Sequence, residues 1–158
     1  MDWIRDEDLV HPADLGAITK DEEKVPTLVT ALLSKYLSKF TEAPILSEAE
    51  VEHLLLPRED VVYSYVVEDE KTKKITDLIS FYNLPSQIIH GNTKHKTLKA
   101  AYSYYTVATS VPLVQLMEDA LILAKCNDFD VFNALDLMEN DTFLRELKFG
   151  IGDGNLHY

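Results

Sequence analysis

Two stretches in the first third of the chain place apolar residues at helical spacing. Thr19 and Glu22 have the spacing of a capping box, in which two side chains satisfy free N–H groups at a helix start. Pro26 falls in the first turn that follows, where its missing N–H costs least. The pattern therefore predicts a helix whose apolar stripe is Val25, Leu28, Val29, Leu32, Tyr36 and Phe40.

A second capping box, Ser47 to Glu50, predicts a short helix. The apolar positions of this helix begin directly after Glu50, and the helix is expected to end before Pro57 because proline cannot continue a helix. The apolar positions are Val51, Leu54 and Leu55.

The period then changes from helix to strand. Val61–Val67 and Ile75–Asn83 are rich in Val, Ile, Tyr and Phe, so both are predicted strands, joined as a hairpin by the polar run Glu68–Lys74. Ala101–Ala108, with three tyrosines, predicts a third strand. Leu84–Thr97 lies between the second and third strands, is too polar for a core element and is long enough to be a binding loop.

The last third returns to helical spacing. Pro112 begins a predicted helix, Phe129–Leu135 is a predicted strand, and Asn140 caps a final short helix that ends at Gly150. Helices thus cover a mostly antiparallel sheet, so the fold class is mixed α/β (α+β). The apolar positions of the first of these helices are Leu113, Leu116, Met117, Ala120, Leu121 and Ala124.

Composition indicates one ordinary globular domain. The chain has 158 residues, 46% hydrophobic and 27% charged, and no apolar run approaches the ~20 residues that cross a bilayer. The acidic N-terminus has no apolar signal region. The single cysteine, Cys126, excludes an internal disulfide and is predicted to be a buried thiol, which fits a cytoplasmic, reducing compartment.

The net charge of −12 limits the kinds of partner that the chain is expected to bind. Nucleic-acid binding depends on Lys and Arg that neutralise phosphates, so this balance argues against it. An acidic surface attracts cationic partners and speeds their encounter, although solubility alone explains the charge equally well.

The C-terminal run Phe149–Tyr158 sets three glycines around Asp153. Glycine accepts tight, positive-φ backbone, so the run suggests close approach to another molecule, and Gly150 suits a helix C-cap. A phosphate-binding loop is rejected because such loops need a helix directly after the glycines, and here a helix precedes them. Five histidines show no metal-ligand spacing, and we predict no metal site.

Several long runs together resemble one family, the eukaryotic protein N-myristoyltransferases (glycylpeptide N-tetradecanoyltransferases), in their C-terminal half. The resemblance extends from about Leu15 to Tyr158, whereas residues 1–14 do not match and are predicted to be a divergent leader. The runs that carry it are EVEHLLLPREDVVYSYVVED (Glu50–Asp69), ITDLISFYNLPS (Ile75–Ser86), HKTLKAAYSYYTV (His95–Val107) and DVFNALDLMENDTFLRELKFG (Asp130–Gly150).

The resemblance implies an acyltransferase fold of the GNAT type. A full enzyme of the family has two such halves, of which residues 15–158 would be the second, peptide-binding one. It also implies peptide contacts, and the tyrosines among them lie at predicted strand ends, where binding residues concentrate. An anionic Asp153 would hold a cationic group of the peptide. The implied contacts are Tyr82, Ser86, Leu98, Tyr102, Asp153 and Leu156.

The family reaction transfers a tetradecanoyl group from myristoyl-CoA to the amine of an N-terminal glycine. By resemblance, the base is the carboxylate at the enzyme's own C-terminus, in a segment expected after Tyr158. The donors that stabilise the thioester oxygen and the acyl-CoA cleft belong to the other half. No residue of this chain is therefore assigned as catalytic, no cofactor is assigned to it, and myristoyl-CoA is the co-substrate of the complete enzyme.

Two alternatives stay open at this point. Instead of the peptide-binding half of such an enzyme, the chain could be a non-catalytic module, such as a truncated product that captures glycine-starting, basic peptides, or a stand-alone GNAT enzyme that acylates a small amine. The second is disfavoured because the sequence lacks the glycine-containing pyrophosphate loop that single-domain GNAT enzymes place before a helix.

If Asp153 contacts a cationic peptide, Asp153→Asn removes the attracting charge and weakens binding. Titration of the chain with a glycine-initiated basic peptide measures this. Unchanged affinity in the variant would count against Asp153 as a contact.

Overall fold

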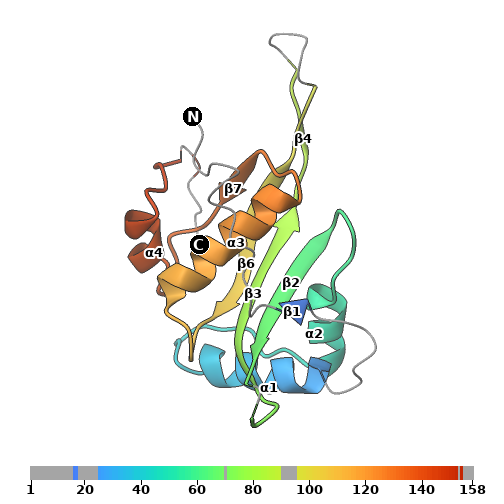
Figure 1. Cartoon of the computed structure of the whole chain (residues 1–158), viewed down its shortest axis with the longest axis vertical. Coiled ribbons are helices and arrows are strands. Elements are labelled where there is room, and N and C mark those ends of the chain that lie inside the picture. Colours follow the sequence, from blue (N-terminus) through green and yellow to red (C-terminus); the bar gives the residue numbers. More distant parts are fainter. Residues whose placement is uncertain (1–15, 18–24, 70, 90–95, 153, 155–158) are drawn as a thin grey trace.

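A five-stranded sheet forms the centre of the molecule (Figure 1). The computed structural model describes residues 16–17, 25–69, 71–89, 96–152 and 154. Neighbouring strands are antiparallel except the last pair, which is parallel, so the predicted mixed α/β fold is confirmed. The strand order is β1 (Gly16–Ala17), β2 (Val62–Glu68), β3 (Ile75–Asn83), β6 (Ala100–Val107) and β7 (Val131–Asn133).

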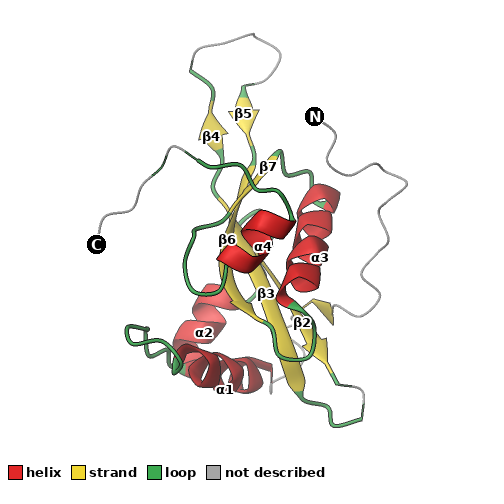
Figure 2. Cartoon of the chain, turned by 90° about the vertical axis from the view of Figure 1, so that its left-hand side faces the viewer, coloured by secondary structure: helices red, strands yellow, loops and turns green. Residues whose placement is uncertain are grey.

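Helices cover both faces of this sheet, at different heights along the strands (Figure 2). Helices α1 (Val25–Leu37) and α2 (Glu48–Leu55) pack near one end of the sheet. Helices α3 (Leu113–Cys126) and α4 (Asp141–Glu146) lie on the other face. A short second ladder, β4 (Ser86–Gln87) with β5 (Thr97–Leu98), extends beyond the sheet.

The first core lies between α1, α2 and the sheet. Buried residues of α1 and α2 meet Val66, Leu78 and Val107, one from each of three adjacent strands. The predicted capping box orients α2, since the Ser47 hydroxyl accepts the Glu50 amide at 3.3 Å and the Glu50 carboxylate accepts the Ser47 amide at 2.8 Å. The capping box predicted at Thr19 lies outside the described residues.

The second core lies between the opposite face and α3 and α4. Phe81 of β3 stands at its centre with no exposed surface, and its ring contacts Tyr63, Phe129 and Phe132 at centroid distances of 5.2 to 5.7 Å. Helix α3 contributes buried Leu116, Met117, Ala120, Leu123 and Ala124, and α4 contributes Phe143.

Helices α3 and α4 are each followed, after one further residue, by a left-handed residue that is not glycine. Lys148 (φ 56°) follows α4; its amide bonds the Arg145 carbonyl and the next amide, of Phe149, bonds Leu144. After α3, the amide of Asp128 (φ 59°) donates to the Lys125 carbonyl, and the next amide, of Phe129, donates to the Ala124 carbonyl. These pairs of bonds satisfy the last carbonyls of a helix. The prediction that Gly150 ends the last helix is therefore wrong.

Three further sequence predictions need correction. Asn140 precedes α4, but its side chain makes no capping bond and instead donates to the Leu135 carbonyl at 2.8 Å. Cys126 is exposed rather than buried, because it is the last residue of α3 and lies beyond the buried stripe that ends at Ala124. Neither Gly152 nor Gly154 has φ in the left-handed region, so the positive-φ backbone expected of the glycine run is not found at these two residues.

Replacing Lys148 by glycine should stabilise the fold, because a left-handed backbone is strained for any residue with a Cβ. We expect Lys148→Gly to raise the free energy of unfolding by about 0.5–1 kcal/mol after the entropy cost of glycine in the unfolded chain. Urea denaturation measures this. The matched control, Lys125→Gly inside α3, should lower it by about 1 kcal/mol, and a loss in both variants would refute the assignment.

Candidate peptide-binding ribbon

Strands β3 and β6 continue past the sheet as one two-stranded ribbon. The Cα partners Tyr82 and Tyr102 belong to the sheet, and Ser86 and Leu98 belong to the β4–β5 ladder. Between them the Leu84 amide donates to the Ala100 carbonyl at 2.9 Å, so the pairing keeps one register. The region predicted as a loop, Leu84–Thr97, is therefore partly a paired arm, which projects from the body in Figure 1.

The tyrosines at the base of the arm form a small aromatic cluster. The rings of Tyr82 and Tyr102 stack at 5.5 Å with an interplanar angle of 17°, and Tyr104 meets Tyr82 edge-on at 5.5 Å. All three side chains are half-buried. Burial raises the pKa of Tyr104, so its hydroxyl is a neutral hydrogen-bonding group over the physiological pH range.

The structure brings four of the six predicted peptide contacts together in two cross-strand pairs. Tyr82 pairs with Tyr102, and Ser86 pairs with Leu98. Ser86 is exposed and Leu98 is partly exposed, so both have surface available for a ligand. The other two predicted contacts, Asp153 and Leu156, lie outside the described residues.

A polar group beside the tyrosines was not expected from the sequence. Asn83 donates from Nδ2 to the Asp60 carbonyl at 3.0 Å, while its buried Oδ1 accepts no hydrogen bond within the described part of the chain. No local pattern marks this residue, because its partner lies 23 positions away.

Lys99 fixes the base of the arm to the end of α3. Its ammonium donates to Asp60 Oδ1 at 3.0 Å and to the Asn127 carbonyl at 3.1 Å, and lies 4.8 Å from the centre of the Phe129 ring. Its own amide donates to the Asp130 carboxylate at 2.7 Å. The hydrogen bond to Asp60 raises the pKa of Lys99, so the cation persists at neutral pH. These contacts position the arm against the domain.

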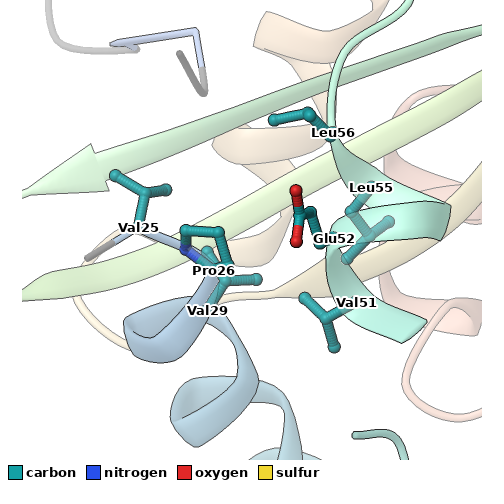
Figure 3. Close-up of a pocket in the computed structure, with 7 residues that line it drawn as sticks. All are labelled: Val25, Pro26, Val29, Val51, Glu52, Leu55 and Leu56. Atoms are coloured by element: carbon teal, nitrogen blue, oxygen red, sulfur yellow. The ribbon is translucent and has the colours of Figure 1, made fainter. Parts of the chain in front are cut away.

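A small hollow between α1 and α2 is a separate feature (Figure 3). Glu52 is the one charged residue among those that line it, and none of the predicted peptide contacts takes part. Its polar chemistry is too sparse to fix the orientation of a ligand. The lining residues are Val25, Pro26, Val29, Val51, Glu52, Leu55 and Leu56.

The part of the chain that the structure describes contains no cluster of three His, Cys, Asp or Glu side chains arranged to hold a metal ion. Among the same residues, no helix is long and apolar enough to cross a membrane.

Comparison with known proteins decides the family. Residues 12–158 match the family described as "Myristoyl-CoA:protein N-myristoyltransferase, C-terminal domain". The chain belongs to this family. It is 59% identical over 147 residues to glycylpeptide N-tetradecanoyltransferase 1 of Arabidopsis thaliana, and 58% identical over 130 residues to glycylpeptide N-tetradecanoyltransferase 2 of Danio rerio. These matches cover 93% and 82% of the chain.

The chain spans about a third or less of the relatives it matches, namely 33% of the Arabidopsis protein and 26% of the Danio protein. The fold is shared with solved structures. A crystal structure of Saccharomyces cerevisiae N-myristoyltransferase with bound myristoyl-CoA superposes with a TM-score of 0.80 at 37% identity, covering 90% of this chain and 38% of that one.

Smaller enzymes share the architecture as well. A Trypanosoma brucei acetyltransferase covers 92% of this chain and 97% of its own length, with a TM-score of 0.63 and 16% identity. At that identity the likeness shows the fold alone. The GNAT-type fold expected from the sequence is thus confirmed, whereas the start of the domain at residue 15 stays a prediction.

The register of the arm predicts which residue pair can be cross-linked. Ile88 donates to the Lys96 carbonyl, so the next pair inward, Gln87 and Thr97, is a non-hydrogen-bonded pair whose side chains lie closest together. In a Cys126→Ser background, Gln87→Cys with Thr97→Cys should form a disulfide on mild oxidation.

Mass spectrometry after alkylation measures the cross-link. The control, Gln87→Cys with Leu98→Cys, shifts one partner by one residue and turns its side chain to the opposite face. Equal oxidation of both variants would contradict the register.

Proposed function

We propose that this chain is the peptide-binding part of a protein N-myristoyltransferase, which transfers a tetradecanoyl group from myristoyl-CoA to the N-terminal glycine of proteins. Membership of the family carries the proposal. The arrangement of the ribbon supports it, since Tyr82, Ser86, Leu98 and Tyr102 fall in two cross-strand pairs of one continuous ribbon.

The ribbon suits an extended peptide. Half-buried tyrosines offer a peptide an apolar ring for contact area and, in the same side chain, a hydroxyl for hydrogen bonding. Ser86 adds an exposed hydroxyl further out along the ribbon. Asp153, as a proposed contact, and the net charge of −12 favour glycine-initiated peptides that carry basic residues.

In the proposed reaction, the glycine amine attacks the thioester carbonyl carbon. The C–N bond forms as the C–S bond breaks, coenzyme A leaves as the thiolate, and the ammonium proton passes to a base. We assign none of these steps to residues of this chain. Its role is to hold the peptide, while the part of the relatives that it does not span is proposed to bind myristoyl-CoA and supply the base. A cytoplasmic location is proposed with it, supported by the single exposed thiol of Cys126.

A chimera tests this assignment. The matched 147 residues of the Arabidopsis relative are replaced by those of this chain, with which they are 59% identical. We expect the chimera to transfer myristate to a glycine-initiated peptide, measured by release of coenzyme A thiol. A chimera with native circular dichroism and no transfer would overturn the proposal.

Two matched variants test the ribbon within that chimera. Ser86→Arg places a cation at the proposed peptide face and should raise the KM for a basic peptide roughly tenfold while kcat changes little. Gln87→Arg adds the same charge to the next residue, whose side chain points to the other face of the strand. Its KM should stay within about twofold of the parent. Equal effects would argue against Ser86 as a contact.

A further inference from the structure

The turn between β6 and α3 closes around a single carboxylate. The amides of three consecutive residues, Thr109, Ser110 and Val111, donate to Oδ1 of Asp77 at 2.6, 2.9 and 3.1 Å. The Ser110 hydroxyl donates to Oδ2 of the same side chain. Asp77 belongs to β3, more than 30 residues earlier in the chain, and has no exposed surface.

The geometry of this turn is that of an anion cradle. It leads from a strand into the 14-residue helix α3, whose N-cap Pro112 makes no side-chain capping bond. Successive amides that point to one side form a concave, electropositive surface, and the helix dipole adds to it. Phosphate groups bind at such places in other proteins.

The anion held here is part of the protein. Thr109 and Ser110 are exposed, whereas Asp77, which accepts the hydrogen bonds of their amides, is a fully buried residue of β3. A second set of bonds holds the turn in place: the Thr109 hydroxyl donates to the Thr76 carbonyl at 2.6 Å, and the hydroxyls of Ser110 and Thr76 are hydrogen-bonded at 3.0 Å. Burial opposes ionisation of Asp77, but the hydrogen bonds from Ser110, Thr76 and the turn amides outweigh it and lower its pKa.

We propose that Asp77 is a built-in substitute for a phosphate group: it fills the cradle at the start of α3 and keeps phosphate-bearing ligands, including the pyrophosphate of an acyl-CoA, from binding there. Asp77 is thus a residue that determines specificity by exclusion. The inference rests on the turn alone and does not require the proposed peptide site.

Removal of the carboxylate tests the proposal. In Asp77→Ala the amides lose their internal partner, and inorganic pyrophosphate should replace it. We expect pyrophosphate at about ten times its Kd to raise the Tm of this variant by about 3–6 °C over sodium chloride of equal ionic strength. The backbone amide resonances of residues 109–111 should shift and saturate over the same concentrations.

Two controls define the specificity. In the wild-type chain neither pyrophosphate nor coenzyme A should shift those three amides. Asp77→Asn keeps an oxygen acceptor of the same shape in the cradle, so it should also show no response to pyrophosphate. Saturable shifts at 109–111 in the wild type, or a folded Asp77→Ala that does not respond, would overturn the proposal.

If Asp77→Ala does not fold in sodium chloride, its refolding in pyrophosphate tests the proposal instead. Recovery of native circular dichroism by Asp77→Ala on addition of pyrophosphate supports the proposal, because an external anion then replaces the lost carboxylate. Failure of both Asp77→Ala and Asp77→Ser to recover in pyrophosphate would overturn it.

Discussion

Burial of β3 on both faces is the constraint on which the rest of the structure depends. Leu78, Ile79, Ser80 and Phe81 all have no exposed surface, and successive side chains enter opposite cores. Two helix layers must therefore be present, and both must be in register with the same strand. Because each face is fully packed, a shift of one residue in β3 would exchange the two sets of side chains and destroy both cores.

That fixed register also carries the candidate site. Tyr82 and Ser86 follow the buried segment directly along the chain, and their partners on the return strand are set by the same pairing. Lys99 ties the base of the arm to Asp60 and to the end of α3. The proposed peptide contacts therefore gain their geometry from a rigid scaffold rather than from their own loop.

The same strand supplies the proposed device at the start of α3. Asp77 is the first of the five fully buried residues of β3, and its carboxylate accepts hydrogen bonds from the turn that follows β6. In the arrangement we propose, one end of β3 presents a surface to a peptide and the other end closes an anion cradle.

The sequence by itself determined what depends on neighbours along the chain. The capping box of Ser47 and Glu50, the two helical stripes and the strands from Val62 and Ile75 follow from local hydrogen bonds and side-chain period, and all were predicted with small errors at their ends. The family resemblance likewise rested on contiguous runs. Tertiary structure alone decided the pairing of Ser86 with Leu98, the exposure of Cys126, the left-handed Lys148 and the burial of Asp77 beneath Ser110. The energy of each depends on atoms that the fold brings together, and no pattern of adjacent residues records those contacts.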